Sequence, residues 1–111
     1  MLVARDNAEI VGYICYGPTP LTNGTWDIYW EAVSREQRGK GIGGILLKAA
    51  EKAIKKARGR LILIETSSTP AYEKTRNFYS RHGYEEIAHV PDFYETGDNK
   101  LIFQKRLNRI K

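Results

Sequence analysis

Apolar residues recur with helical spacing through the middle of the chain. From residue 42 to residue 57 they follow the i, i+3, i+4, i+7 rule, which predicts an amphipathic helix. The apolar stripe consists of Ile42, Ile45, Leu46, Ala49, Ala50, Ala53, Ile54 and Ala57. Gly59 follows and predicts a left-handed cap at the end of this helix. Because the stripe contains several alanines, we expect the helix to pack closely on a sheet.

Shorter apolar and β-branched runs on either side of this helix predict strands. The runs at 2–5 and 9–16 flank a tight polar turn and predict a hairpin, and the run at 26–33 predicts a third strand. The alternation of apolar and polar residues along this third run is imperfect near its end, which indicates a β-bulge. Leu61–Ile64 is continuously apolar, as is typical of a central strand buried on both faces. Strand, helix and strand form a βαβ unit, which predicts two parallel strands with a right-handed crossover.

The last third of the chain predicts one more helix and two more strands. Thr69 and Pro70 are cap and first-turn residues, and they predict a helix over 71–82 that Gly83 ends. Strands at 84–90 and 100–107 follow, joined by a polar, acidic loop. The whole order predicts an α+β (α/β-like) fold with a mixed, mostly antiparallel sheet and one central parallel βαβ unit. We expect residues 1–111 to form a single domain.

Composition narrows the function classes. With 41% hydrophobic and 28% charged residues, the chain is typical of a globular protein. It has no apolar stretch of ~18 residues and no signal-peptide pattern, so we expect no membrane partner and a cytoplasmic location. Cys15 is the single cysteine, which excludes an internal disulfide, and we expect it to be a small core residue. His82 and His89 have no zinc-ligand spacing, so we expect no metal.

The net charge of +5 does not point to nucleic acid. Nucleic-acid binders gather cations on one element with interleaved aromatic residues. Here the cations of residues 48–58 lie at helical spacing opposite the apolar stripe, which is the pattern of a solvated helix face. We therefore expect no nucleic-acid partner.

Residues 38–44 carry the clearest chemical signal. They read Arg38, Gly39, Lys40, Gly41, Ile42, Gly43 and Gly44, at the start of the predicted helix. Bare amides, a positive helix end and two cations suit a phosphate ligand. The segment also satisfies the G-x-G-x-x-G pattern of dinucleotide-binding folds, with Glu65 placed as a ribose-binding acid would be. However, five polar residues separate the strand from the glycines and there is one βαβ unit, which disfavours a dinucleotide site.

Two motifs together resemble a known family. Arg38-x-x-Gly41-x-Gly43, between a strand ending in Ala32-Val33 and an apolar helix, resembles the acetyl-CoA loop of the GNAT N-acetyltransferase superfamily. Arg76-x-Phe78-Tyr79-x-x-x-Gly83-Tyr84 resembles the family's FYxxxGF helix and strand. The segment from Val90 to Tyr94, followed by residues 100–107, resembles its common terminal hairpin. The resemblance extends over essentially the whole chain.

The resemblance implies a coenzyme A site and a pair of catalytic residues. Residues 38–44 would bind the pyrophosphate, Ala32 and Val33 would lie beside the pantetheine arm, and the Val33 N–H would polarise the thioester carbonyl. Tyr72 stands where the family often has an asparagine that holds the arm. Tyr79 matches the general acid, and Glu65 matches the general base of several members.

Four residues of the strand at 26–33 leave alternatives open. Glu31 and Asp27 are expected to share a face by period two, and either is a rival base or an attractant for a cationic amine. Tyr29 and Trp30 are expected to face opposite ways, one filling the core and the other lining the acceptor pocket.

The implied function is an acetyl-CoA-dependent N-acetyltransferase that moves the acetyl group directly to a primary amine of a small molecule or peptide. Family domains usually begin with a strand and two helices over the acceptor site. The chain lacks them, so we expect an N-terminally shortened member whose exposed sheet face is covered in a homodimer. The alternative is a non-catalytic acyl-CoA-binding or regulatory module, or a subunit whose acceptor site a partner chain completes.

Overall fold

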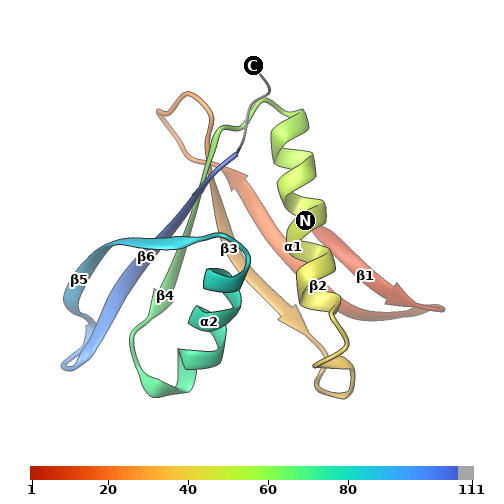
Figure 1. Cartoon of the computed structure of the whole chain (residues 1–111). Helices are drawn as coiled ribbons and strands as arrows, with labels where there is room; N and C mark the ends of the chain where they lie inside the picture. Colours follow the sequence, from red (N-terminus) through yellow and green to blue (C-terminus); the bar gives the residue numbers. More distant parts are fainter. Residues whose placement is uncertain (108–111) are drawn as a thin grey trace.

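The computed structural model describes residues 1–107 and consists of one six-stranded sheet with two helices (Figure 1). The strand order across the sheet is β1-β2-β3-β4-β6-β5. The strands are β1 (Leu2–Asp6), β2 (Glu9–Pro18), β3 (Thr25–Val33), β4 (Leu61–Ser67), β5 (Glu85–Glu95) and β6 (Asp98–Arg106). The helices are α1 (Ile42–Lys56) and α2 (Glu73–Arg81), with 3₁₀ turns at Arg35–Gln37 and Pro70–Tyr72. This order and the mixed sheet with its β3–β4 parallel pair confirm the predicted fold class.

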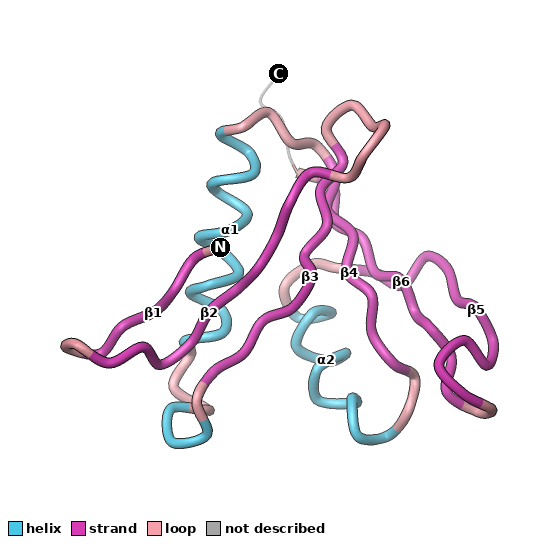
Figure 2. Tube along the Cα trace, turned by 180° about the vertical axis from the view of Figure 1, so that it is seen from behind, coloured by secondary structure: helices cyan, strands magenta, loops and turns pink. Residues whose placement is uncertain are grey.

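Both helices lie on the same face of the sheet, and the core fills the space between them and the strands (Figure 2). Ile14 of β2, Leu47 and Ile54 of α1, and Ile62 of β4 are fully buried there. The opposite face has no helix among the described residues. For that reason Leu61 and Leu63 of β4 are only partly buried, although their apolar run predicted burial on both faces.

Helix α1 matches its predicted range, but its buried stripe is rotated. Leu46, Leu47, Ala50 and Ile54 are buried, whereas Ile45 is 66% exposed. The left-handed residue after the helix is Arg58 (φ 69°) and not Gly59. Gly59 is needed for another reason, because a Cβ there would collide with Cγ2 of Ile54.

The second helix and the C-terminal hairpin also differ from the prediction in their limits. Helix α2 begins at Glu73, after a 3₁₀ turn at Pro70–Tyr72. Most of the polar segment predicted as a loop is strand, and β5 and β6 are joined by a tight turn with Gly97 at φ 85°. Because β5 is an edge strand exposed along its whole length, it tolerates Pro91 and a polar sequence.

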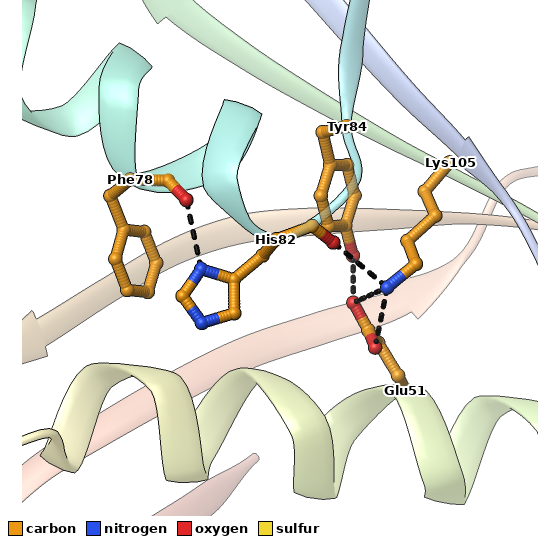
Figure 3. A network of polar contacts seen from close by, with 5 residues as sticks. All are labelled: Glu51, Phe78, His82, Tyr84 and Lys105. Carbon is orange, nitrogen blue, oxygen red and sulfur yellow. Dashed lines mark hydrogen bonds and ion pairs between the residues drawn. The ribbon is translucent and has the colours of Figure 1, made fainter.

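A polar network ties α1 to the end of α2 and to β6 (Figure 3). The Tyr84 hydroxyl donates a hydrogen bond to Glu51 over 2.7 Å, and Lys105 forms an ion pair with Glu51 at 3.1 Å. Lys105 also donates to the His82 carbonyl over 2.9 Å. Burial, together with the hydrogen bond to Glu51, raises the pKa of the Tyr84 hydroxyl, which therefore remains a donor. No helix in the described part of the chain has the length and apolarity that crossing a bilayer requires.

Candidate functional site

The parallel strands β3 and β4 separate part-way along the sheet and open a cleft. Their register runs from Thr25 opposite Leu61 to Ile28 opposite Ile64, and within residues 1–107 the two strands are not paired beyond that point. Figures 1 and 2 both show α2 lying across the gap between the diverging strands. A cavity of about 450 Å³ occupies this cleft. Its lining residues are Ile28, Tyr29, Trp30, Glu31, Ile64, Glu65, Thr66, Ser67, Tyr72, Thr75, Tyr79, Tyr94 and Asp98.

A β-bulge in β3 decides which side chains enter this cleft. Cys15 of β2 pairs with Trp30 and Tyr16 pairs with Ile28, so Tyr29 is the extra residue. The bulge indicated by the sequence is thereby confirmed. Its consequence was not predicted, because it reverses the inward and outward alternation for every residue that follows.

Glu31 and Asp27 therefore lie on opposite faces, which corrects the prediction that they share one. Glu31 pairs with the fully buried Ile14 and enters the core side, while Asp27 pairs with Gly17 on the other face. Asp27 accepts a hydrogen bond from the Thr19 hydroxyl over 2.7 Å.

The aromatic residues at the bulge are also placed differently from the prediction. Tyr29 is 52% exposed and Trp30 is 57% exposed, and both line the cleft. Neither fills the core, because the bulge removes Tyr29 from the regular alternation. Cys15 shares the outer face with Trp30 and is half-buried rather than a core residue.

The glycine loop lies beside the cleft, at the start of α1. Gly39 and Gly41 both adopt φ 82°, a conformation that favours glycine, and a Cβ at either position would meet no atom within 4 Å. Gly41 is the N-cap of α1 and provides no side-chain cap, so the first amides of the helix are left for another acceptor. Arg38 returns to the strand, where its Nε donates to the Val33 carbonyl over 3.3 Å.

A second cavity, of about 360 Å³, joins this loop to α2. It is lined by Glu31, Val33, Arg38, Gly43, Lys74, Thr75, Phe78, Tyr79 and Arg81. Three of these residues are cations, which suits an anionic ligand next to a helix start. We call this the loop-side cavity and the larger one the cleft cavity.

Val33 presents its backbone toward the gap. The Ser34 N–H donates to the Val11 carbonyl of β2 over 2.7 Å. Because N–H groups alternate sides along a strand, the Val33 N–H is directed away from β2 and toward the separated β4. The backbone beside Ala32 and Val33 can therefore accept an extended ligand as if it were a strand.

Glu31 and Tyr79 lie where the two cavities meet. Both residues line both cavities. Burial raises the pKa of the Glu31 carboxyl to about 7, and its Oε2 is buried with no hydrogen-bond partner among residues 1–107. Burial, with a contribution from Glu31, raises the pKa of the Tyr79 hydroxyl, so this group stays protonated at neutral pH.

Glu65 occupies the mouth of the cleft. It follows Ile64 at the point where the strands separate, and its carboxylate forms an ion pair with Lys100 of β6 at 3.3 Å. The Glu65 side chain is 57% exposed. Tyr72, in the 3₁₀ turn before α2, also lines the cleft cavity and is exposed.

Several lining residues were not identified from the sequence. Lys74 and Arg81 share one face of α2 with Phe78, and their i, i+4, i+7 spacing was the available signal. Thr75 lines both cavities, and Thr66 contributes a buried hydroxyl that has no hydrogen-bond partner within residues 1–107. Arg76 has a structural role, because its Nη1 donates to the carbonyls of Ser67 and Thr69.

We find no metal centre in the part of the chain described. Residues 1–107 contain no group of three or more His, Cys, Asp or Glu side chains placed to hold a metal ion.

Comparison with known proteins places the chain in a family. Residues 1–86 match the family described as acetyltransferase (GNAT) domain. An uncharacterized N-acetyltransferase of Methanocaldococcus jannaschii is 34% identical over 94% of this chain and 64% of its own length. A GNAT-family protein from Desulfovibrio desulfuricans is 39% identical, with a TM-score of 0.93, over 94% of this chain and 65% of its own.

The fold also occurs in more distant structures. An aminoglycoside 6'-N-acetyltransferase complexed with coenzyme A has a TM-score of 0.82 at 22% identity, over 98% of this chain and 73% of its own. The chain thus spans just under two thirds of the length of the Methanocaldococcus and Desulfovibrio relatives. Since the family match covers residues 1–86 of 111, the chain belongs to the GNAT acetyltransferase family.

Proposed function

We propose that the chain is an acetyl-CoA-dependent N-acetyltransferase that transfers the acetyl group directly to a primary amine. The observation that carries this proposal is the separation of β3 from β4 beside a glycine loop at a helix start. The gap offers strand backbone to an extended ligand, the loop offers amides to its phosphates, and Tyr79 lies where the two meet.

The residues present fit coenzyme A. Loop amides from residues 38–44 and the cations of the loop-side cavity would hold the phosphates. Ala32 and Val33 would lie beside the pantetheine arm, with the Val33 N–H as a donor to the thioester carbonyl. Tyr72 would close the cleft side of the arm. Coenzyme A is the ligand in the complex of the aminoglycoside acetyltransferase, which shares this fold.

Direct transfer requires two proton movements. The ammonium form of the acceptor must lose a proton before its nitrogen can attack the carbonyl carbon, and the departing thiolate must gain one. Tyr79 is suited to be the acid, because its hydroxyl remains protonated in the buried junction. A cleft carboxylate serves as the base, and Glu65 is the candidate that the family resemblance implies.

The cleft mouth favours a cationic acceptor. Glu65 and Asp98 line it, and negative charge at an exposed entrance raises the local concentration of an ammonium ion. The Thr66 hydroxyl, buried and without a partner among residues 1–107, would hydrogen-bond the acceptor. These features suit a primary amine of a small molecule or of a peptide.

A homodimer is part of the proposal. Exposed aromatic side chains at the bulge, Tyr29 and Trp30, lie at a sheet face that carries no helix in the described residues. Apolar surface of this kind is commonly covered by a partner. Light scattering at high concentration tests this point, and a monodisperse monomer would argue against it.

Acetyl-CoA binding and amine-dependent thiol release together test the function. We expect calorimetry to show one acetyl-CoA site per chain, and we expect release of free CoA when n-butylamine, spermidine or a peptide with a free N-terminus is added. Binding without CoA release would favour a non-catalytic acyl-CoA-binding module. Absence of binding would overturn both functions.

A further inference from the structure

Glu31 is a half-buried residue whose carboxyl oxygen Oε2 is buried, and no contact among the described residues explains this position. It pairs across the sheet with Ile14, and it lines the loop-side cavity together with Val33, Gly43, Phe78 and Tyr79 and with the polar residues Arg38, Lys74, Thr75 and Arg81. An ion pair within 4.0 Å is absent for Glu31 among residues 1–107, and Oε2 also lacks a hydrogen-bond donor there. A carboxyl buried in this way destabilises a folded protein, so its presence indicates a use for it.

The β-bulge and a glycine together create the place that Glu31 occupies. The extra residue Tyr29 turns Glu31 from the outer face to the helix side of β3. A Cβ on Gly43 of α1 would lie 3.6 Å from Glu31 Oε2 and 3.5 Å from Cζ of Phe78. The carboxyl is therefore enclosed between β3, the first turn of α1, and α2, and it opens into both cavities.

Charged and titratable groups surround Glu31 on both sides of the junction. Those on the loop side are Arg38, Lys74 and Arg81, and those on the cleft side are Glu65, Asp98, Tyr72 and Tyr94. Tyr79 lines both cavities, and the Tyr84 ring packs edge-on against the Tyr79 ring at 5.9 Å between centroids. Cations on the loop side would be partly neutralised by a bound anion. Among the carboxyl groups that line the two cavities, Glu31 is the one that lines both.

Glu65 differs from Glu31 in each of these respects. It is paired with Lys100, it is mostly exposed to solvent, and it lines the cleft cavity without reaching the loop-side cavity. A carboxylate at the mouth can attract an ammonium ion. A base must instead reach the nitrogen at the point of attack.

We propose that Glu31 is the catalytic base that accepts the proton of the attacking amine, and that Glu65 acts at the entrance. This rests on the proposed acetyl transfer. The raised pKa of Glu31 agrees with it, since a base that titrates near neutral pH is effective there.

The proton balance of the step is complete. Glu31 carboxylate takes one proton from the ammonium, and the free nitrogen attacks the thioester carbonyl carbon. The carbon–sulfur bond breaks, and the thiolate takes the proton of the Tyr79 hydroxyl. The second proton of the nitrogen returns to Tyr79 as the amide forms, and Glu31 releases its proton to water. One amide, one thiol and one free proton result.

The test compares Glu31→Gln with Glu65→Gln, using acetyl-CoA and the same three amines. We expect Glu31→Gln to lower kcat by at least about 100-fold with unchanged calorimetric affinity for acetyl-CoA. We expect the rise of kcat/KM through about pH 7 in the wild type to disappear in this variant. Glu65→Gln is expected to raise KM for spermidine by a few-fold and to keep the pH profile. In the wild type without acetyl-CoA, ¹³C NMR should show the Glu31 carboxyl titrating near pH 7.

The same assays separate the role of Glu31 from acetyl transfer itself. If Glu31→Gln turns over as fast as the wild type and keeps the same pH profile, the role of Glu31 is overturned and the proposed acetyl transfer is not. A Glu31 carboxyl that titrates near pH 4 in the NMR experiment also overturns the role of Glu31. A wild type that binds acetyl-CoA and releases no CoA with any of the three amines overturns the proposed function, and this inference with it.

Discussion

Glu31 of β3 and Tyr79 of α2 are both in contact with the cleft cavity and with the loop-side cavity. The bulge at Tyr29 directs the first of these side chains inward, and the position of α2 across the gap between β3 and β4 brings the second. A carboxyl and a phenol thus share one partly buried junction, in which burial and the charge of Glu31 raise the cost of ionising Tyr79.

Replacing Tyr79 by Phe should lower turnover and leave acetyl-CoA binding intact. The ring keeps its edge-on contacts with Phe78 and Tyr84, while the proton donor is lost. We expect a loss of about 100-fold or more in kcat, measured as CoA release at neutral and alkaline pH. Unchanged turnover over that pH range would remove Tyr79 from the mechanism.

Replacing Gly41 by Ala should weaken acetyl-CoA binding by at least about tenfold. An alanine at φ 82° costs on the order of 1 kcal/mol, and its methyl group would lie where a phosphate must approach the backbone. The matched control is Gly97→Ala, because Gly97 has φ 85° and equally open space but lies in the β5–β6 turn. Both variants should lose similar stability. An equal loss of acetyl-CoA affinity in the two would contradict a phosphate site at the loop.

The stability of the free protein should respond to pH through Glu31. Burial raises its folded-state pKa from 4.5 to about 7, so the unfolded chain ionises first as the pH rises. The contribution of Glu31 is therefore most favourable below pH 4.5 and is lost by about pH 7. Glu31→Gln cannot ionise at this position and lacks this loss. Relative to the wild type, its free energy of unfolding should therefore increase by about 1 kcal/mol between pH 4.5 and pH 7.5, allowing for partial solvation. Urea unfolding at both pH values measures it, and a constant difference would contradict a buried Glu31.

Removing the Tyr84 hydroxyl should destabilise the fold without affecting the site. Tyr84→Phe deletes the hydrogen bond to Glu51, which is charge-assisted and part-buried, and should cost about 1.5 kcal/mol of the free energy of unfolding. Tyr94→Phe is the control, since that side chain is exposed on β5 and should change stability little. Equal urea midpoints for the two variants would show that the network in Figure 3 contributes nothing measurable.

The sequence predicted the helices and strands whose apolar residues recur at a regular spacing. It also predicted the glycine loop, because both kinds of feature depend on local rules. Helix α1 and the parallel pair were correct in type and place, and the loop lies at the helix start as predicted. The length of the strands in the β5–β6 hairpin was underestimated, since an exposed edge strand carries no apolar alternation.

The directions of the side chains inside the site could not be predicted from the alternation of residues along a strand. The sequence indicated a bulge in β3, but only the pairing with β2 identifies Tyr29 as the extra residue. That single residue determines whether Glu31 and Asp27 share a face. Similarly, Lys74 and Arg81 become part of the site because α2 lies over the gap, a tertiary placement that helical spacing does not specify.

A crystal structure of the protein with acetyl-CoA would show directly whether the loop and the cleft hold this ligand. We expect the pyrophosphate on the amides of residues 38–44 and the pantetheine arm against Ala32 and Val33. The thioester sulfur should lie within hydrogen-bond distance of the Tyr79 hydroxyl, with the acetyl group beside Glu31. Acetyl-CoA bound elsewhere, or a thioester remote from both Glu31 and Tyr79, would contradict this expectation.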